Sequence, residues 1–548
     1  MLKDTNNKIL MIIPLALVCM LLSGLFLPVY SDEIVTKFYM ARFFLENEQM
    51  LSFFPQCTTS VGHHVAWVFY PAAILISSIY AYLEPFGLRV SGVILALIWF
   101  TLLAYWCFRQ SPEGWVERFT LLIGCAALGV MPYLWVLSRP EQFMYLPILL
   151  ISIAALYLPP QRGAWRQIAL AGLFGLLVSI FFYAHPKSLF FTPFCLAAAW
   201  ITTREFKTFI RASLCLYVIA LAAQVLRNNI LLGSCQDAPA VQAILAANTL
   251  MPGMLLNAPV AFVIEAIHNI IQFPERMLTH LTFSPSFQSG WLPPIATGTY
   301  VVSWLNILIH YTLFSLVIGS HLLALGLATV NLLRRRLSIA LLLAALLAMG
   351  DLINIALYKL QNFYAGIQYI PLSIIITLLL FRCLPDIRSY GTTKVAQRIL
   401  LCYVVSLSLA SLITLLYLVT PNLLRNSNYT NASLPGQYLS VPVFGVNAHI
   451  ESILELGKLC HLPTENAEHL VVDHMTYFAY LKNKNPVHVL YVSELGYGGD
   501  LLNGKLLPFL KKRNSPGLIT RCEWVPKDLR ELQQQNDRGY CCIDFNGK

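Results

Sequence analysis

Charged residues are scarce in this chain, which has 548 residues. Only 12% are Asp, Glu, Lys or Arg, whereas 57% are hydrophobic, and the mean hydropathy is +0.64. Soluble globular domains carry roughly 25% charged residues, so this shortage excludes an ordinary soluble protein. The sequence also contains no internal repeat and no low-complexity segment.

Long apolar runs are present instead, and a run of about 17 to 25 apolar residues spans a bilayer as a helix. We therefore expect an α-helical polytopic membrane protein with about eleven transmembrane helices. The candidate spans are 9–29, 90–108, 119–138, 143–158, 167–184, 188–203, 209–228, 306–333, 337–357, 366–383 and 399–420. No small-x-small cleavage site precedes Ser31, so the first run is expected to be a retained helix and not a signal peptide.

The net charge of +10 does not indicate a nucleic-acid partner, because Lys and Arg lie mostly in short loops between spans. They include Arg162, Arg166, Arg204, Lys207, Arg211, Arg334 to Arg336, Arg388, Lys394 and Arg398. This distribution follows the positive-inside rule and predicts that these loops and the N-terminus are cytoplasmic. Residues 30–89, a large loop of 229–300 and everything after 420 are then extracytoplasmic.

The apolar segment 65–83 must not cross the membrane if this topology is correct, because one more crossing would reverse every later loop. We expect it to lie in or against the interface as an amphipathic or half-buried helix. The segment IVTKFYMARFFLE, residues 34–46, has apolar residues on one face, and this spacing also suits a helix along the interface. The outer loop 30–89 is thus expected to contain juxtamembrane helices.

Two domains follow from this organisation. Residues 1–420 form the transmembrane domain, and residues 421–548 form an extracytoplasmic soluble domain. In the second domain HIESILELGKLC has helical periodicity, while HLVVD, VHVLYV and GLITRCEWV resemble short strands separated by turn residues. We expect a small mixed α/β fold.

A C-x-x-C pair is absent, so the cysteines give no argument for structural zinc. Seven of the 13 cysteines lie within predicted spans, where a thiol is a small hydrophobic group. The six predicted to face outward are Cys57, Cys235, Cys460, Cys522, Cys541 and Cys542. An even number in an oxidising compartment permits disulfides. Their pairing does not follow from the sequence, although the adjacent Cys541 and Cys542 are not expected to bond each other.

Asp32 and Glu33 follow the first span directly. Their carboxylates have two interpretations: they cap the helix that follows, or one of them is a general base whose pKa is raised by partial desolvation. His63 and His64 lie in the same outer segment, and they are weak candidates for a metal site because a pair of histidines lacks a full set of ligands.

Further polar residues lie at three predicted outward turns. VLSRPEQF contains Arg139 and Glu141, YAHPKSLFF contains His185 and Lys187, and LYKLQNFYAGIQYIPL contains Lys359, Tyr364 and Tyr369. Charges and tyrosines at a membrane edge are often only anchors. A guanidinium oriented by a neighbouring acid is nevertheless well suited to bind a phosphate. If these turns meet, they form a cationic cavity at the outer membrane edge.

The order of these features resembles the C-type membrane glycosyltransferase superfamily (GT-C), in the branch of the protein O-mannosyltransferases and the lipid A aminoarabinose transferase. The residues that carry the resemblance are YSDE (30–33), the segment 63–97, VLSRPEQF (136–143), YAHPKSLFFTPF (183–194) and NFYAGIQYIPLSIII (362–376). They extend over about 400 residues. Two of them depart from the family pattern: His185-Pro186-Lys187 stands where Lys-Gly-Pro is common, and the segment 63–97 lacks Pro-Leu after its histidines.

The resemblance implies an inverting transfer of a sugar from a polyprenyl-phosphate donor to an acceptor on the outer face of a bacterial inner membrane. The acceptor is a cell-surface glycan, lipopolysaccharide, another lipid or a protein. Asp32 matches the position of the catalytic base, with Glu33 as the alternative. Arg139, Lys187 and Lys359 match the positions that bind the lipid phosphate, and Glu141 orients Arg139 or contacts the sugar. No cofactor is required, although a divalent cation is compatible with the scheme.

Three other functions are consistent with parts of the sequence. A flippase for polyprenyl-linked glycans also has many spans, but its sites usually include broken spans with acids at mid-membrane; here Asp351 is the one such acid that we identify. A ligase of the O-antigen type uses Arg and His in a long outer loop, and 229–300 contains Glu265, His268, Arg276 and His280. The third alternative is a receptor that acts through its outer domain.

Overall fold

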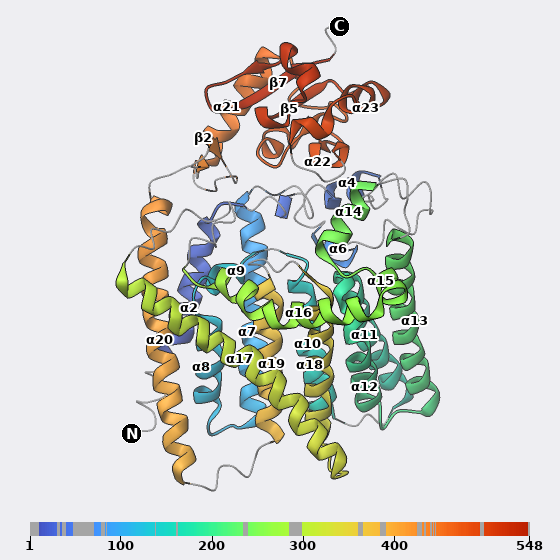
Figure 1. Ribbon diagram of the computed structural model, residues 1–548, viewed down its shortest axis with the longest axis vertical. Helices are drawn as coiled ribbons and strands as arrows, with labels where there is room; N and C mark the ends of the chain where they lie inside the picture. The colour runs from blue at the N-terminus through green and yellow to red at the C-terminus, as the bar shows by residue number, and fades with distance from the viewer. Residues whose placement is uncertain are drawn as a thin grey trace.

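The computed structural model describes residues 10–29, 33–34, 40–47, 71–77, 83, 85–137, 139–159, 163–233, 239–283, 299–359, 365–383, 391–424, 430–431, 434–438, 441, 443, 445–493 and 498–545. These residues form a helical bundle with a small domain of helices and strands at one end (Figure 1). The small domain contains the C-terminal part of the chain.

Two sets of helices make up the first domain. The helices along the bundle are α2 (Ile12–Ser23) with η1 (Gly24–Phe26), α7 (Pro85–Gln110), α8 (Trp115–Ala126), α10 (Gln142–Tyr157), α11 (Ala164–Ala184), α12 (Thr192–Thr202), α13 (Thr208–Gly233), α17 (Tyr300–Leu333), α18 (Ile339–Leu357), α19 (Gly366–Cys383) and α20 (Gly391–Leu424). The shorter or peripheral helices are α4 (Met40–Asn47), α6 (Pro71–Ser77), α9 (Met131–Leu134), η5 (Pro186–Phe191), α14 (Pro239–Asn248), α15 (Pro252–Asn257), α16 (Pro259–Leu278) and η6 (Thr279–Leu281).

Seven of the described helices are long and apolar enough to cross a membrane, judged by length and composition: α7, α11, α13, α17, α18, α19 and α20. Each of them matches a span expected from the sequence. The expected spans 9–29 and 143–158 correspond to shorter apolar helices, Ile12–Phe26 and Gln142–Tyr157. The chain is therefore a helical membrane protein, as predicted.

The expected span 119–138 is not one helix, because α8 ends at Ala126 and α9 begins only at Met131. The cause is a long-range contact of the intervening turn. Gly129 has φ +56° and donates its backbone N–H to Ser411 Oγ at 2.7 Å, while Val130 N donates to Leu281 O at 3.1 Å. A Cβ on Gly129 would lie 1.9 Å from Leu281 O, so glycine is required here. The expected span 188–203 likewise begins as η5 before α12.

Aromatic residues form the core beneath the turn that contains Arg139. The rings of Trp99 and Trp135 have centroids 4.8 Å apart, and Tyr145 lies 5.8 Å from Trp99 and 5.4 Å from Trp135. A Cβ on Gly92 of α7 would lie 1.9 Å from Val136 O. Because α7 approaches the backbone of this segment so closely, the turn at 139–141 has a well-defined position.

A layer of short helices separates the bundle from the C-terminal domain. Figure 1 places α4, α6 and α14 between them. Of the segment 65–83 the structure describes only residues 71–77, which form the seven-residue helix α6, and residue 83. The rest of the segment that was expected not to cross the membrane lies outside the described residues. The interfacial helix expected over 34–46 is described only as α4 and residues 33–34; the other residues of that prediction lie outside the described residues.

The predicted outer loop 229–300 is largely helical in its described part. Figure 1 draws α15 and α16 running across the bundle and not along it. One face of α16 exposes apolar side chains, among them Val260 and Ile271, which are 72% and 71% exposed. A helix with this pattern is typical of a membrane interface.

The C-terminal domain is a small mixed α/β fold, as predicted. Its strands are β1 (Thr430–Asn431), β2 (Leu434–Tyr438), β3 (Val471–Val472), β4 (Val487–His488), β5 (Gly517–Arg521), β6 (Gln534–Gln535) and β7 (Tyr540–Asp544). Its helices are α21 (Val446–Leu459), η10 (Tyr477–Tyr480), α22 (Val489–Val492), η11 (Gly499–Leu502), α23 (Leu506–Lys512), η12 (Cys522–Trp524) and η13 (Lys527–Leu532). The strand order of the main sheet is β4-β3-β5-β7-β6. In it β3 is parallel to β4 and β5, and β7 is antiparallel to β5 and β6.

The helix expected from HIESILELGKLC is α21, and the three expected strands contain β3, β4 and β5. In VHVLYV, however, the strand has two residues and is followed at once by α22. His488 explains the change, because its Nδ1 accepts a hydrogen bond from Leu490 N and begins the helix. The antiparallel pair of β6 and β7 was not predicted.

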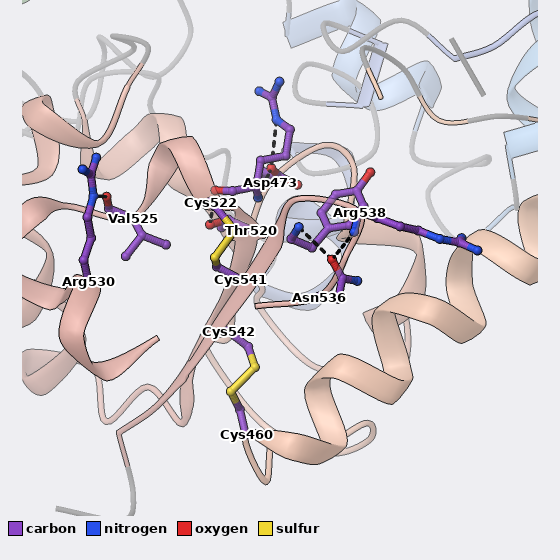
Figure 2. Close-up of a disulfide and its surroundings, with 12 residues drawn as sticks. Cys460, Asp473, Thr520, Cys522, Val525, Arg530, Asn536, Arg538, Cys541 and Cys542 are labelled. Atoms are coloured by element: carbon purple, nitrogen blue, oxygen red, sulfur yellow. Dashed lines mark hydrogen bonds and ion pairs between the residues drawn. A yellow bond between two sulfur atoms is a disulfide. The ribbon is translucent and has the colours of Figure 1, made fainter. Parts of the chain in front are cut away.

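Two disulfides cross-link this domain, between Cys460 and Cys542 and between Cys522 and Cys541 (Figure 2). The adjacent Cys541 and Cys542 therefore bond different partners, as expected, because neighbouring residues of β7 point to opposite faces of the sheet. One bridge joins β7 to the end of α21 and the other to the end of β5. Cys57 and Cys235 lie outside the described residues.

Hydrogen bonds attach the C-terminal domain to the outer layer. Val29 N donates to Val441 O at 2.9 Å. Arg42 of α4 donates to Asn483 O, and Asn47 Nδ2 donates to Asn485 Oδ1 at 2.6 Å. The end of the first helix, α4 and the C-terminal domain are thus in direct contact.

Candidate functional site

The turn between α9 and α10 contains a buried ion pair. Arg139 Nε lies 3.2 Å from Glu141 Oε2, and Arg139 Nη2 lies 3.3 Å from Glu141 Oε1. The two residues are 6% and 2% exposed. Pro140 separates them, so the local turn brings both side chains to the same side. The carboxylate orients the guanidinium through two contacts, which is the arrangement predicted from VLSRPEQF.

His185 and Lys187 belong to the break between α11 and η5. His185 ends α11 with extended backbone angles, and its Nδ1 accepts the backbone N–H of Lys187 at 3.1 Å. This bond leaves the other ring nitrogen, Nε2, to carry the proton of the neutral imidazole. The Lys187 side chain is buried, and its Nζ lies 4.7 Å from the centroid of the Tyr358 ring, within the range of a cation–π contact.

These four side chains interact electrostatically. Burial would raise the pKa of Glu141, but Arg139, His185 and Lys187 lower it to about 2. Burial and the nearby Lys187 lower the pKa of His185 to about 3, so this imidazole is neutral at physiological pH. Burial also lowers the pKa of Lys187, and the carboxylates of Glu141 and Asp351 oppose that shift. The structure therefore brings Arg139, Glu141, His185 and Lys187 together, as the sequence predicted.

Asp351 extends this cluster into the bundle. It is fully buried in α18, where its Oδ2 lies 3.1 Å from His321 Nε2 of α17 and its Oδ1 accepts from Gln368 Nε2 of α19 at 3.3 Å. Asp351 precedes the end of α18 by six residues, which corresponds to a depth of roughly 9 Å. Its role was not explained by the sequence, and His321 was not identified as a site residue.

His321 Nδ1 lies 2.7 Å from Val317 O and 3.3 Å from Ser320 Oγ. In the group formed by Arg139, Glu141, His185 and Lys187, the imidazole is neutral, so the charges are those of Arg139, Lys187 and Glu141, two positive and one negative. With Lys187 protonated, these four residues have a net charge of +1.

Glu33 is buried in a different ion pair. Arg89 Nη2 lies 3.0 Å from Glu33 Oε2, and Arg89 Nη1 donates to Glu33 Oε1 at 3.1 Å; both side chains are fully buried. Arg89 also donates to the carbonyl oxygens of Leu27 and Pro28. Arg89 lies one helical turn before Gly92, and Gly92 contacts the Val136 backbone. The Glu33–Arg89 pair therefore lies near the base of the turn that contains Arg139. Asp32 lies outside the described residues.

Lys359 and Tyr369 have other contacts. Lys359 Nζ donates to Ala246 O near the end of α14 at 3.0 Å, where a cation satisfies a terminal carbonyl. Arg276 Nη1 donates to Lys359 O at 2.9 Å. Tyr369 packs its ring against Phe273 of α16, with centroids 4.7 Å apart. Among the described contacts, none joins Lys359 to Arg139 or Lys187. Tyr364 lies outside the described residues.

Among the described residues, no group of three or more His, Cys, Asp or Glu side chains is placed to bind a metal ion. His63 and His64 lie outside them. Of the four residues that suggested a ligase in 229–300, Glu265 and His268 are exposed on α16, and Arg276 donates to Asn269 and Lys359. Glu265 and His268 are therefore not part of a buried site.

The arrangement is suited to binding an anion. Arg139 is oriented by Glu141, and among the described residues none accepts a hydrogen bond from Lys187 Nζ, whose contact is with the Tyr358 ring. A buried ammonium without an acceptor is costly unless a ligand supplies one. A phosphate oxygen would satisfy its donors and neutralise the excess positive charge.

No protein family matches the sequence of this chain, and a search of the curated proteins finds no match.

Proposed function

We propose that this protein is an integral membrane glycosyltransferase with a GT-C-like fold, which uses a polyprenyl-phosphate sugar as donor. The observation that supports this most strongly is the buried cluster of Arg139, Glu141 and Lys187, whose net charge is positive. Among the described residues, none accepts a hydrogen bond from the Lys187 ammonium of this cluster. A lipid phosphate is a good leaving group when cations surround it. The motif resemblance and the positions of the cluster at helix ends point in the same direction.

In this proposal the acceptor oxygen attacks the anomeric carbon and inverts it, while the bond from that carbon to the phosphate oxygen breaks. The electron pair of the broken bond passes to the phosphate, whose negative charge Arg139 and Lys187 stabilise. The acceptor proton passes to a carboxylate. Because Glu33 is paired with Arg89, we assign Asp32 as this base, adjacent in sequence to the fixed Glu33.

The proposed topology has about eleven transmembrane helices, including the short α2, α8, α10 and α12. The N-terminus is cytoplasmic, and the site and residues 421–548 are extracytoplasmic, in a bacterial inner membrane. This orientation follows from the basic loops and the positive-inside rule. It places the donor phosphate at the membrane surface, where an acceptor glycan, lipopolysaccharide, lipid or protein is accessible.

A flippase for polyprenyl-linked glycans is the second candidate, favoured by two features. The α8–α9 segment is broken at Gly129, and Asp351 and His321 form a polar pair inside the bundle. Polar pairs at this depth often belong to transport pathways. The glycosyltransferase is preferred because the cluster with the net positive charge lies at the end of the bundle, next to the C-terminal domain.

A transfer assay separates the two candidates. Purified protein in liposomes is given a labelled polyprenyl-phosphate sugar and an acceptor extract. The proposal predicts labelled acceptor from the native protein and loss of product from Asp32→Asn, with Asp500→Asn as an exposed control. Movement of donor between leaflets without any product would support the flippase, and product from Asp32→Asn at the native rate would reject Asp32 as base.

The C-terminal domain is proposed to bind the acceptor, because it is attached directly above α4 and the end of the first helix. Removing residues 424–548 should then lower transfer to a polymeric acceptor more than transfer to a short one. Equal activity of the truncated and full chains on the polymer would contradict this assignment.

A further inference from the structure

A second cationic site lies at the other end of the bundle from Lys187. It is a cavity of about 450 Å³ lined by Ala155, Leu156, Arg204, Ser338, Ile339, Ala340, Arg382 and Cys383. These residues come from the end of α10, the turn after α12, the beginning of α18 and the end of α19. Because α18 has 19 residues, the cavity is roughly 27 Å along this helix from the cluster described above.

Arginine side chains converge beside this cavity. The guanidinium groups of Arg382 and Arg109 lie 4.9 and 5.7 Å from the centroid of the same ring, Tyr157. Neither forms an ion pair within the described part of the chain. Two like charges beside one ring repel each other, and a nearby anion would offset this repulsion. Arg204 lies 3.8 Å from Glu205, but both are more than half exposed, so this pair is weak.

The beginning of α18 adds positive potential to the same cavity. Ser338 is the N-cap, with its Oγ accepting from Leu341 N at 3.3 Å. The first backbone N–H groups of a long helix carry a partial positive charge and favour anions. Arg204, Arg382 and this helix end thus contribute to one site from separate segments of the chain.

Exposed apolar side chains lie on two of the helices at this end of the bundle. Ile339 lines the cavity and is 39% exposed, and Trp200 of α12 is 53% exposed. Arg211 lies 4.0 Å from the Trp200 ring. A ligand with an anionic head and apolar chains would place its head among the arginines and its chains along this surface, as lipids do at basic pockets between transmembrane helices.

We propose that this cavity binds the phosphate group of an anionic phospholipid. Its volume is in the range of ligand sites, roughly 300 to 1,000 Å³, and accommodates a phosphodiester with its glycerol. The site is separate from the proposed transfer site and does not depend on that activity. It would attach the basic end of the bundle to one kind of membrane lipid.

The test measures lipid binding by the full-length protein in a neutral detergent with native mass spectrometry. Arg204→Gln and Arg382→Gln are each expected to weaken binding of phosphatidylglycerol about fivefold. Arg334→Gln is the matched control, because Arg334 is exposed near the same end but does not line the cavity. Equal binding by all three variants would overturn the proposal.

A second measurement uses the native protein and needs no variant. Cys383 lines the cavity, whereas Cys402 is an exposed free cysteine elsewhere. Phosphatidylglycerol should slow maleimide labelling of Cys383 and leave Cys402 unchanged, and phosphatidylcholine should have no effect. Equal protection by millimolar inorganic phosphate would mean a site for the free anion, and no protection by phosphatidylglycerol would mean no site; either result rejects the lipid.

Discussion

At the scale of single residues, the structure describes one of the two predicted catalytic acids, Glu33, while Asp32 lies outside the described residues. Glu33 is fully buried against Arg89, with two hydrogen bonds between the side chains. Removing one member of a buried pair leaves the other charge without a partner, which costs about 3 to 5 kcal/mol. The main role of Glu33 in this geometry is therefore to fix the outer end of the first helix to α7.

This role leads to a prediction for Glu33→Gln. We expect the variant to lose about 3 kcal/mol of stability because Arg89 remains buried and charged. The double variant Glu33→Gln with Arg89→Met should recover most of the loss. Thermal unfolding of the purified proteins measures both effects. A Glu33→Gln protein with native stability and no transfer activity would show instead that Glu33 acts in catalysis.

His185 predicts a pH dependence of stability. Its pKa is about 3 in the folded protein, below the ordinary value of 6.5, because the ring is buried beside Lys187. Between these values the unfolded state binds more protons than the folded state, so stability falls as the pH falls from 6.5 toward 3. Glu141, with a pKa of about 2, adds to the fall only below its ordinary value of about 4.5.

We therefore expect His185→Gln to lose less stability than the native protein between pH 7.5 and pH 5. Melting temperatures at several pH values test this. The histidines of the C-terminal domain, such as His488 with its pKa lowered to about 4 by burial, are present in both proteins and cancel in the comparison. Parallel curves for the two proteins would contradict the burial of a neutral His185.

The sequence predicted part of this residue-level picture. Arg139 and Glu141 are two residues apart, and His185 and Lys187 flank one proline, so short-range pattern was enough to group each pair. The Glu33–Arg89 and Asp351–His321 pairs join residues far apart in the chain, and their partners were not predicted. The sequence did contain one signal for the second pair. His321 and Asp351 are isolated polar residues within apolar spans, and such residues usually pair with one another.

At the scale of helices and strands, long apolar runs predicted the long helices well, because a continuous span needs only local sequence. The break between α8 and α9 was missed because it depends on Leu281, about 150 positions away in the sequence. The backbone oxygen of Leu281 accepts a hydrogen bond from Val130 N. The same applies to β7, which pairs with β5 and with β6 and is joined to the end of β5 by the Cys522–Cys541 disulfide.

Gly129→Ala tests the reason for this break. The new Cβ would lie 1.9 Å from Leu281 O, and the backbone has φ +56°, so we expect a loss of about 1 to 3 kcal/mol. Gly319→Ala in α17 is the control, since a Cβ there meets nothing within 4 Å and alanine favours the helix. Thermal unfolding should show opposite shifts, and a native melting temperature for Gly129→Ala would contradict the close contact.

At the scale of the whole molecule, the proposed function requires charge to be separated along the bundle. One end, beneath the C-terminal domain, has a buried cluster in which Arg139 and Lys187 exceed Glu141. The other end has arginines on aromatic rings around a cavity. In the proposed topology the apolar helices between them place these two sites on opposite sides of the membrane, with the first on the side of the proposed extracytoplasmic acceptor.

Sugar transfer by Lys187→Gln, compared with the exposed Lys207→Gln at the other end of the bundle, tests the proposed role of the buried cluster. Both proteins should fold and melt as the native protein does. With a labelled polyprenyl-phosphate sugar, we expect Lys187→Gln to transfer at least about a hundredfold more slowly than the native protein and Lys207→Gln to be unaffected. Transfer by folded Lys187→Gln at the native rate would contradict the proposed role of the buried cluster.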